Sequence, residues 1–288
     1  MSTYKSSNAF NGAKLHQWFD NTLVYILLVL VAVITVFPFL WVFFTSFKGV
    51  NDPIFSVPPQ LLPSSPTVDN YLRVFTQLPM LSFYFNSLVV TLTVVVVNTL
   101  FGALAAYPLA KMKFRGRDAI FYTLLATYVV PPVLTSIPSF VLAVNVFHFY
   151  DKLASVIFPY LSGVLTIFLL RQAFAAIPDD LINAARIDGA NELQIWWSIL
   201  LPTIRPSLAT VAIITFVDQW NNFFWPSLML HTRANMTLQV GLVALQGAFA
   251  NDARGIAAGV VMTVVPMIIF FALLQKQFIA GLTGAVKG

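Results

Sequence analysis

The segment Ile177–Pro202, IPDDLINAARIDGANELQIWWSILLP, begins with polar and charged residues and lies between two apolar stretches. Pro178, followed by two aspartates, is typical of a helix start, and Asn191 with Glu192 forms a second one. Gly189 lies between them, where a left-handed residue can end a helix. This segment, the 177–202 loop, is therefore predicted to form two short helices that bend at Gly189. Each helix would have about 10 residues and a length of about 15 Å, too short to cross a membrane.

One side of this predicted pair carries small side chains, which allow another surface to approach closely. That side consists of Leu181, Ala184, Ala185 and Asp188. We expect it to dock on another protein. The alternative is an amphipathic segment that lies at the lipid headgroups, where Trp196 and Trp197 would anchor it.

The composition of the whole chain indicates a membrane protein. Of its 288 residues, 58% are hydrophobic and 9% are charged, whereas soluble proteins carry about 25% charged residues. The mean hydropathy is +0.81. Nearly charge-free runs are long enough to cross a hydrocarbon core about 30 Å thick. They predict an all-α integral membrane protein with six transmembrane helices: 23–46, 84–110, 119–143, 153–173, 206–229 and 257–279.

The segments between these helices are mostly short. The first apolar run has no small-residue cleavage site after it, so we expect a retained helix, 23–46, after an N-terminal segment, 1–22. Residues 47–82 are rich in proline, serine and aspartate, which disfavours helix and strand and predicts an extended extracytoplasmic connection. Residues 83–279 hold the other five helices, and 280–288 form a C-terminal tail.

Basic residues predict the orientation, because lysine and arginine are enriched on the cytoplasmic side of membrane proteins. With both termini in the cytoplasm, 11 of the 16 lysines and arginines lie inside. The five outside are Lys48, Arg73, Lys152, Arg233 and Arg254. We therefore expect cytoplasmic termini, with the basic cluster Lys111–Arg117 as the strongest anchor.

The chain lacks the residues that several other functions need. It contains no cysteine, which excludes disulfides and thiolate metal sites. His16, His148 and His231 have no metal-site spacing, and we predict no metal site. No Gly-x-Ser-x-Gly motif is present, and we predict no catalytic residue. No Gly-x-x-x-x-Gly-Lys-[Ser/Thr] phosphate loop is present either, so we expect no ATPase activity and no bound cofactor in this chain.

The spacing in the 177–202 loop resembles the EAA loop of permease subunits of bacterial ABC importers. That pattern is Glu-Ala-Ala, three positions, Gly, nine positions and Ile-x-Leu-Pro. Asn183 departs from it, because the family has glutamate there. The resemblance implies a type I ABC importer permease fold, with the loop as a cytoplasmic coupling helix seated on an ATPase. The residues it assigns to coupling are Ala184, Ala185, Asp188, Gly189, Ala190, Ile199, Leu201 and Pro202.

Other motifs resemble the carbohydrate branch of this family, in particular subunits similar to the smaller maltose permease. They are Pro38-x-x-Trp41, Asn86-Ser87, Ala105-Ala106-Tyr107, Phe114-Arg115-Gly116-Arg117, Trp220-Asn221-x-Phe-x-Trp225-Pro226 and the chain end Gln275–Gly288. The resemblance implies a sugar or sugar-like solute, such as an oligosaccharide, a glycosylated polyol or a glycerol phosphate.

The same resemblance implies the partners and the location. The partners are a second homologous permease, two ATPase subunits that bind ATP and Mg, and an extracytoplasmic solute-binding protein. The location is the cell inner (plasma) membrane. The chain end would reach between the two ATPases, through Gly284, Ala285, Val286, Lys287 and Gly288.

Asp218 is the acidic residue that falls within a predicted span, 12 residues after Pro206 and so about 18 Å along the helix, near mid-membrane. Carboxylates and amides bind sugar hydroxyls, and an indole covers the apolar face of a sugar ring. In a continuous helix, one face carries a substrate path of Asp218, Asn221, Asn222 and Trp225, with Gln219 and Trp220 at its edge. The alternative is a packing seam in which Asp218 accepts hydrogen bonds from the second permease.

A secondary transporter driven by an ion gradient is the other functional class that fits the composition. In that class, Pro131, Pro132 and Pro138 would break the third helix, and Asp218 would bind a proton or a cation. The prolines also fit ordinary kinks of a spanning helix. The EAA spacing favours the ABC permease.

Overall fold

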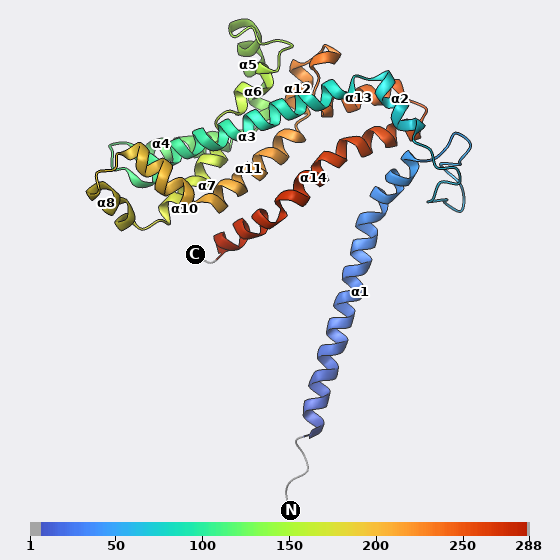
Figure 1. The fold of residues 1–288 in the computed structure, drawn as a ribbon, viewed down its shortest axis with the longest axis horizontal. Coiled ribbons are helices and arrows are strands. Elements are labelled where there is room, and N and C mark those ends of the chain that lie inside the picture. The colour runs from blue at the N-terminus through green and yellow to red at the C-terminus, as the bar shows by residue number, and fades with distance from the viewer. Residues whose placement is uncertain (1–6, 287–288) are drawn as a thin grey trace, which may run out of the picture. The chain divides into compact units, whose positions relative to one another are not determined.

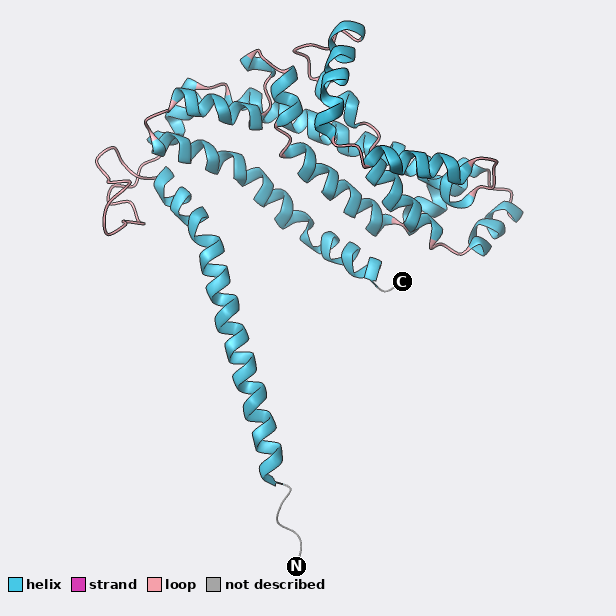
Figure 2. Ribbon diagram, turned by 180° about the vertical axis from the view of Figure 1, so that it is seen from behind, coloured by secondary structure: helices cyan, strands magenta, loops and turns pink. Residues whose placement is uncertain are grey.

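The structure is a computed structural model that describes the backbone of residues 7–286 and the side chains of residue 22 and residues 24–273. Every regular element of the described backbone is helical (Figure 2). In chain order the elements are α1 (Ser7–Ser46), α2 (Asp69–Gln77), α3 (Met80–Lys111), α4 (Arg117–Tyr128), α5 (Pro132–Val141), η1 (Leu142–Val146), α6 (Ala154–Ile157), η2 (Phe158–Tyr160), α7 (Val164–Ala175), α8 (Asp179–Ile187), α9 (Glu192–Gln194), η3 (Ile195–Leu200), α10 (Leu201–Thr203), α11 (Arg205–Trp220), α12 (Phe224–Met229), η4 (Arg233–Asn235), α13 (Leu238–Ala248) and α14 (Ala253–Val286).

The described residues include enough apolar helix for the predicted spans. Two helix pairs, Arg117–Tyr128 with Pro132–Val146 and Glu192–Thr203 with Arg205–Trp220, pass the length and hydropathy test only when each pair is taken together. With each pair counted as one span, the total is six. The four single helices that pass are Val24–Ser46, Met80–Lys111, Ala154–Ala175 and Ala253–Leu273. The all-α membrane fold is therefore confirmed, with two of its six candidate spans sharply bent.

The predicted third helix, 119–143, is one of the bent segments. α4 ends at Tyr128, and α5 begins at Pro132 after a bend of 96°. Two consecutive prolines explain the bend, because proline lacks an N–H group and restricts the residue before it. Pro131 and Pro132 thus redirect the chain, which is a larger effect than the kink of a continuous helix.

Two helices occur where the sequence predicts none. α2 lies within residues 47–82, so the prediction of a wholly extended connection is wrong for Asp69–Gln77. Its first turn carries Asp69, which interacts favourably with the helix dipole, and it lies in the proline-free stretch between Pro66 and Pro79. α13 is a short apolar helix that the spanning pattern does not reveal because it has only 11 residues.

Two compact units make up the chain, and residues 47–68 belong to the first, which contains Met1–Arg73 and Asn251–Val261. Polar side chains tie this 47–68 loop together. The Lys48 side chain is buried, and its Nζ donates to the carbonyl oxygens of Pro53 at 2.9 Å and Gln60 at 2.6 Å. The Asp52 carboxylate accepts hydrogen bonds from the backbone N–H of Ser65 at 3.2 Å and from its hydroxyl at 3.1 Å.

The second unit contains Val74–Ala250 and the chain from Met262 onward, and α3 packs along α7 and α11 at its centre (Figure 1). A buried amide joins the three helices. Asn98 on α3 donates to Thr166 Oγ1 on α7 at 2.9 Å and to Thr215 Oγ1 on α11 at 3.1 Å. One turn further along α3, a methyl group added to Gly102 would clash with the Thr166 side chain. We call Asn98, Thr166 and Thr215 the Asn98 junction.

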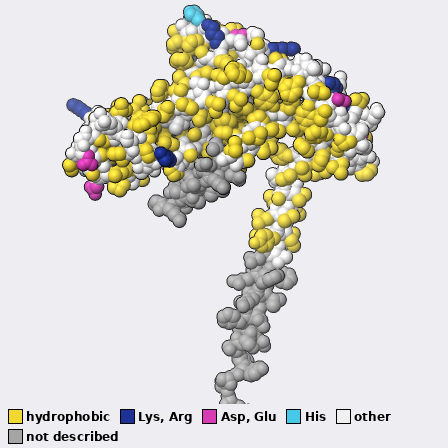
Figure 3. Space-filling view, in the orientation of Figure 1, with side chains coloured by type: hydrophobic (Ala, Val, Ile, Leu, Met, Phe, Trp, Pro, Cys, Tyr) yellow, Lys and Arg dark blue, Asp and Glu magenta, His cyan; other side chains and the backbone are white. Residues whose placement is uncertain are grey.

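Hydrophobic side chains cover most of the surface that Figure 3 shows, and charged side chains appear in separate groups. On α3, for example, Val96 is 54% exposed and Leu104 is 49% exposed. Apolar surface of this extent fits contact with lipid or with another protein.

Candidate functional site

The 177–202 loop forms the two predicted short helices, α8 and α9, with a bend at Gly189. Gly189 has a φ of +85°, a left-handed conformation that other residues rarely adopt. A Cβ atom at Gly189 would meet nothing within 4 Å, so the requirement for glycine is conformational. α9 begins with a capping box, in which the Asn191 side chain accepts from the Gln194 N–H and the Gln194 side chain accepts from the Asn191 N–H. The chain then continues through the π-helical turn η3.

An ion pair closes this hairpin and a tyrosine attaches it to α3. Arg186 on α8 donates from Nε to Glu192 Oε1 on α9 at 2.9 Å, with its Nη2 at 2.8 Å from the same oxygen. The other carboxylate oxygen of Glu192 accepts a hydrogen bond from the Tyr107 hydroxyl on α3. Both oxygens of this carboxylate are therefore engaged, one within the loop and one by the helix beneath it.

Lys111, one turn after Tyr107 on α3, fixes the start of the loop. Its Nζ lies 2.5 Å from the carbonyl oxygen of Ile177 and 2.6 Å from Asp179 Oδ1. Asp179 lies in the first turn of α8. The hydrogen bond and the positive charge of Lys111 lower the pKa of the Asp179 carboxyl group. The end of α7 and the start of α8 are thus attached to α3 by one ammonium group.

A third attachment lies one turn earlier on α3. The Trp196 side chain is 6% exposed, and its Nε1 donates to the Ala103 carbonyl oxygen at 3.3 Å. Ala103, Tyr107 and Lys111 recur every four residues, so they lie on one face of α3. The sequence prediction did not assign Tyr107, Arg186 or Glu192 to the site, and it gave Lys111 only a role in orientation. The four-residue spacing of Tyr107 and Lys111 could have indicated that they share one face of α3, but no signal in the sequence indicates their partners in the loop.

The coupling residues expected from the resemblance divide into an exposed and a buried group. Ala184, Asp188, Gly189 and Pro202 are exposed, and Ala190 is half-buried. Ala185 was expected on the docking side, but it is 7% exposed and packs into the core below the loop with Leu201 and the half-buried Ile199. These three apolar residues hold the loop in place. The exposed side instead includes Ile187, which is 86% exposed.

The predicted substrate path is not the face of one helix. α11 ends at Trp220, and α12 begins at Phe224, so the expected continuous helix 206–229 is broken. Pro226 accounts for the break, because proline cannot supply the N–H group that a continuing helix requires. The exposed or half-buried members of the path are Asp218, Gln219, Asn221 and Asn222.

The two tryptophans of the predicted path point into the protein. Trp220 is 2% exposed and stacks on Phe216, with ring centroids 5.7 Å apart. Trp225 is 6% exposed, and its Nε1 donates to the Ser155 carbonyl oxygen at 2.8 Å. The prediction that these indoles cover a sugar ring is therefore wrong, because both serve the packing of the bundle.

Residues 98–283 match the family model described as binding-protein-dependent transport system inner membrane component. This chain belongs to that family. It is therefore an inner membrane component of a transport system and a multi-pass membrane protein.

Curated relatives of this permease align over nearly their whole length. It is 35% identical over 261 residues to the arabinooligosaccharides transport system permease protein of Halalkalibacterium halodurans, covering 90% of this chain and 93% of that protein. It is 32% identical to the trehalose transport system permease protein of Mycobacterium tuberculosis, covering 87% of this chain and 92% of that protein. The carbohydrate ABC permease resemblance of the sequence is confirmed.

A solved structure confirms the fold of the permease. A chain of a bacterial ABC transporter involved in the import of the acidic polysaccharide alginate superposes with a TM-score of 0.77 at 25% identity. The superposition covers 96% of this permease and 100% of that chain. The predicted ABC importer permease fold is therefore correct.

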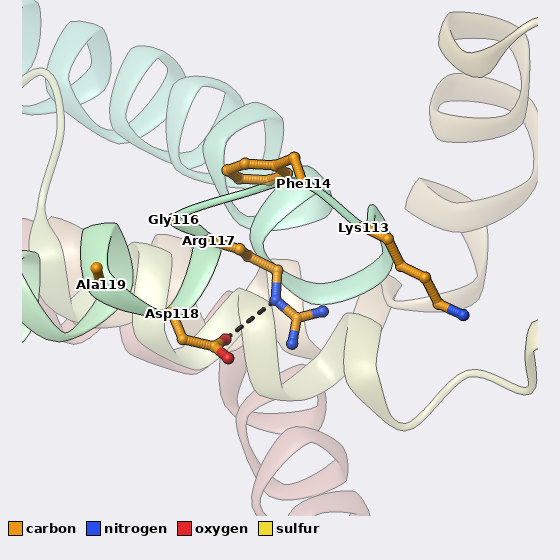
Figure 4. Close-up of a pocket in the computed structure, with 6 residues that line it drawn as sticks. All are labelled: Lys113, Phe114, Gly116, Arg117, Asp118 and Ala119. Carbon is orange, nitrogen blue, oxygen red and sulfur yellow. Dashed lines mark hydrogen bonds and ion pairs between the residues drawn. The ribbon is translucent and has the colours of Figure 1, made fainter.

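The basic cluster of the permease forms the turn between α3 and α4 (Figure 4). A shallow pocket there is lined by Lys113, Phe114, Gly116, Arg117, Asp118 and Ala119. Arg117 Nε lies 3.0 Å from Asp118 Oδ1, and the Lys113 side chain points away from that pair. Gly116 adopts a φ of +90° at the turn. The cluster is thus an exposed helix connection whose charges are partly paired.

The chain end was also predicted to contact the ATPases. α14 continues as far as Val286, so the backbone of Gly284, Ala285 and Val286 is helical. Lys287 and Gly288 lie outside the described residues, as do the side chains of the residues after 273.

Proposed function

We propose that this permease forms half of the translocation path of an ABC importer for a sugar or a sugar-like solute. The names of its relatives support this proposal, since they are transport permeases for arabinooligosaccharides and for trehalose. The sulfoquinovosyl glycerol permease of Agrobacterium fabrum, 32% identical over 88% of this chain, extends the solute class to glycosylated polyols.

The observation that carries the mechanism is the hairpin of the 177–202 loop. It is attached to α3 by polar contacts, and it exposes Ile187 together with Ala184 and Asp188. An apolar side chain that is 86% exposed outside the candidate spans gains stability when a partner buries it. In the proposed importer, this surface docks on one of two ATPase subunits, which bind ATP and Mg, while this chain binds no cofactor.

The complete transporter also contains a second homologous permease and an extracytoplasmic solute-binding protein. The description of the family as binding-protein-dependent supports the second partner. Both termini lie in the cytoplasm and the complex lies in the cell inner membrane, as the excess of basic residues in the inner segments favours. ATP binding brings the two docking hairpins together, and the two permeases rock as rigid bodies to change access.

The path for the solute includes Asp218, Gln219, Asn221 and Asn222. The exposure of Asp218 and Asn221 supports this assignment, and Gln219 and Asn222 are half-buried beside them. Together these groups offer a carboxylate and amides for hydrogen bonds to sugar hydroxyls.

Replacing Ile187 tests the docking assignment. In the complete complex, reconstituted with ATPases and binding protein, Ile187→Asp should lower ATP-dependent solute uptake at least tenfold and weaken retention of the ATPases on purification. A tenfold loss corresponds to about 1.4 kcal/mol, within the value of burying one isoleucine side chain.

Val57→Asp is the matched control, because Val57 is a 99% exposed apolar residue in the 47–68 loop. It should leave ATPase retention unchanged. Full uptake and full ATPase retention by Ile187→Asp would contradict the docking role. Uptake by this chain alone under an ion gradient, with no ATPase present, would show a secondary transporter instead.

A further inference from the structure

We infer that Tyr107 and Glu192 are positioning residues for energy coupling: they make the 177–202 hairpin and α3 move as one body. This inference rests on the proposed docking of the hairpin on an ATPase. In this inference, neither Tyr107 nor Glu192 touches the solute or a nucleotide. Their role is to carry a displacement of the hairpin into the centre of the bundle.

The part of the hairpin on either side of Gly189 needs such an attachment, because few residues of α8 and α9 are buried, whereas η3 packs in the core through Ile195 and Trp196. Of the nine residues of α8, Ile182 and Ala185 are buried, and none of the three residues of α9 is buried. Hydrophobic packing of α8 and α9 is therefore limited. A displacement of these helices by a partner would rotate them on the protein surface unless polar contacts held them.

The Glu192 carboxylate supplies those contacts at the bend itself. It binds Arg186 of α8 through one oxygen and Tyr107 of α3 through the other. Hydrogen bonds to an ionised group are about twice as strong as those between neutral groups. The Tyr107 ring adds rigidity, because the residue is 3% exposed and its ring lies edge-on to Phe174 of α7, 6.0 Å between centroids.

α3 then connects this contact to the Asn98 junction. Tyr107 lies nine residues after Asn98, about 14 Å along the same helix. The junction bonds α3 to α7 and to α11 at Thr215, one turn before Asp218. A rigid helix thus links the hairpin to the segment that carries the proposed solute path.

The direct route along the chain is sharply bent, whereas the route through α3 follows one continuous helix. Between Glu192–Thr203 and Arg205–Trp220 the helix axis bends by 80° at Ile204. A bend at a single residue can act as a hinge, so motion of the hairpin need not reach α11 through the backbone. The contact with Tyr107 bypasses this hinge.

Two conservative substitutions test the inference. Tyr107→Phe removes the hydroxyl donor and keeps the ring, and Glu192→Gln removes the charge and keeps the shape. In the complete reconstituted importer, we expect each to lower the number of solute molecules imported per ATP hydrolysed about fivefold to tenfold, as loss of one charge-assisted hydrogen bond allows. The double variant should be no worse than the more severe single variant, because Tyr107→Phe removes and Glu192→Gln weakens the same contact. Tyr25→Phe, on the 68% exposed Tyr25 of α1, should leave the ratio unchanged.

The outcomes separate this inference from the proposed docking. A cysteine placed by Ile187→Cys in this cysteine-free chain should cross-link to an ATPase subunit in the otherwise unchanged protein and in both variants. An unchanged import-to-hydrolysis ratio in both variants, with the cross-link intact, would overturn the positioning role alone. Failure of both variants to assemble would also overturn it, because the contact would then serve stability. Absence of the cross-link in the otherwise unchanged protein would overturn the docking itself.

Discussion

The 177–202 loop and the 47–68 loop are both held by contacts of charged side chains, which are buried in the 47–68 loop and exposed in the 177–202 loop, and those contacts end in different places. In the 47–68 loop, Lys48 and Asp52 bind backbone groups of the same loop. In the 177–202 loop, Glu192 and Asp179 bind side chains of α3, which lie far away in the sequence. The 47–68 loop is therefore held largely by its own backbone, with two further hydrogen bonds from Arg254 to the carbonyl oxygens of Val50 and Asp52. A loop held by the side chains of a neighbouring helix passes displacement to that helix.

Replacing the glycine at the bend of the 177–202 loop should have the largest effect on transport. Gly189→Val should abolish most solute uptake, at least a tenfold loss, because a β-branched residue at a φ of +85° costs about 1–3 kcal/mol and would shift α9 off Tyr107. Binding protein should still engage. The measurement is ATPase activity of the purified complex with loaded binding protein, together with uptake in vesicles.

Gly116→Val is the control for Gly189→Val, because Gly116 has a φ of +90° and a Cβ there also meets nothing within 4 Å. It carries the same backbone strain without lying in the hairpin, so uptake per ATP hydrolysed should persist. Full stimulated ATPase activity and transport in Gly189→Val would remove the coupling role of the bend.

The 47–68 loop should respond in stability and not in coupling. Lys48→Met leaves the carbonyl oxygens of Pro53 and Gln60 without their donor, which should lower the free energy of unfolding by about 1–3 kcal/mol. Thermal unfolding of the purified complex and proteolysis within residues 47–68 measure this loss. Lys152→Met is the control, since the Lys152 ammonium is exposed, and should change stability by less than about 0.5 kcal/mol. A lower import-to-hydrolysis ratio in Lys48→Met would break the contrast between the loops.

Asp218 is an exposed carboxylate on a candidate span, and replacing it tests the proposed solute path. Asp218→Asn and Asn221→Ala should change the apparent affinity for the solute, or the order of preference among solutes, about threefold to tenfold with assembly intact. Transport assays with several labelled sugars measure this effect. Trp225→Phe, which removes the hydrogen bond to Ser155, should lower stability and leave solute preference unchanged. Unaltered uptake of every accepted solute by both path variants would reject the path, and failed assembly would favour a seam with the second permease.

Lowering the pH should have the smallest effect, a local loss of stability in the 47–68 loop. Burial raises the pKa of the Asp52 carboxyl, but hydrogen bonds from Ser65 and Gly49 outweigh it and lower the pKa below 3.8. Because the folded pKa is depressed, the stabilisation is complete above pH 3.8 and is lost as the pH falls below that value. Hydrogen exchange of residues 47–68 should therefore increase below about pH 4 and lose this step in Asp52→Asn. A step of equal size in both proteins would contradict the role of Asp52.

Local signals in the sequence were sufficient for the hairpin and insufficient for its attachment. Pro178, Gly189 and Asn191 act on their immediate neighbours, so the two short helices were predicted correctly. The contacts of Glu192 and Asp179 with α3 span 85 and 68 residues of sequence. No periodicity within one segment reveals which residues will meet across such a separation. The glutamate of the family pattern is replaced by Asn183, and the carboxylate that joins the hairpin to α3 at Tyr107 is that of Glu192.

Two other errors came from treating apolar length as helix continuity. A run long enough to span a membrane predicts one helix over residues 206–229, but the chain breaks between Trp220 and Phe224, shortly before Pro226. The prolines up to Pro66 predict an extended connection, and for this reason α2 is not expected. α2 can form because the chain contains no proline between Pro66 and Leu78. Six spans could be predicted from the sequence. The breaks within them depended on single prolines and on packing between helices that are not adjacent in sequence.

The Asn98 junction has a consequence for the order in which the protein is made. During synthesis α3 enters the bilayer before α7 and α11 exist, so the Asn98 amide has at first neither of its threonine partners. An unpaired amide in hydrocarbon is costly, and the close fit of Gly102 against Thr166 is equally incomplete until α7 arrives. Assembly of the bundle centre therefore waits until synthesis has passed α11, which ends at Trp220. A ribosome that stalls between α3 and α7 would leave α3 in the bilayer with the Asn98 amide unpaired.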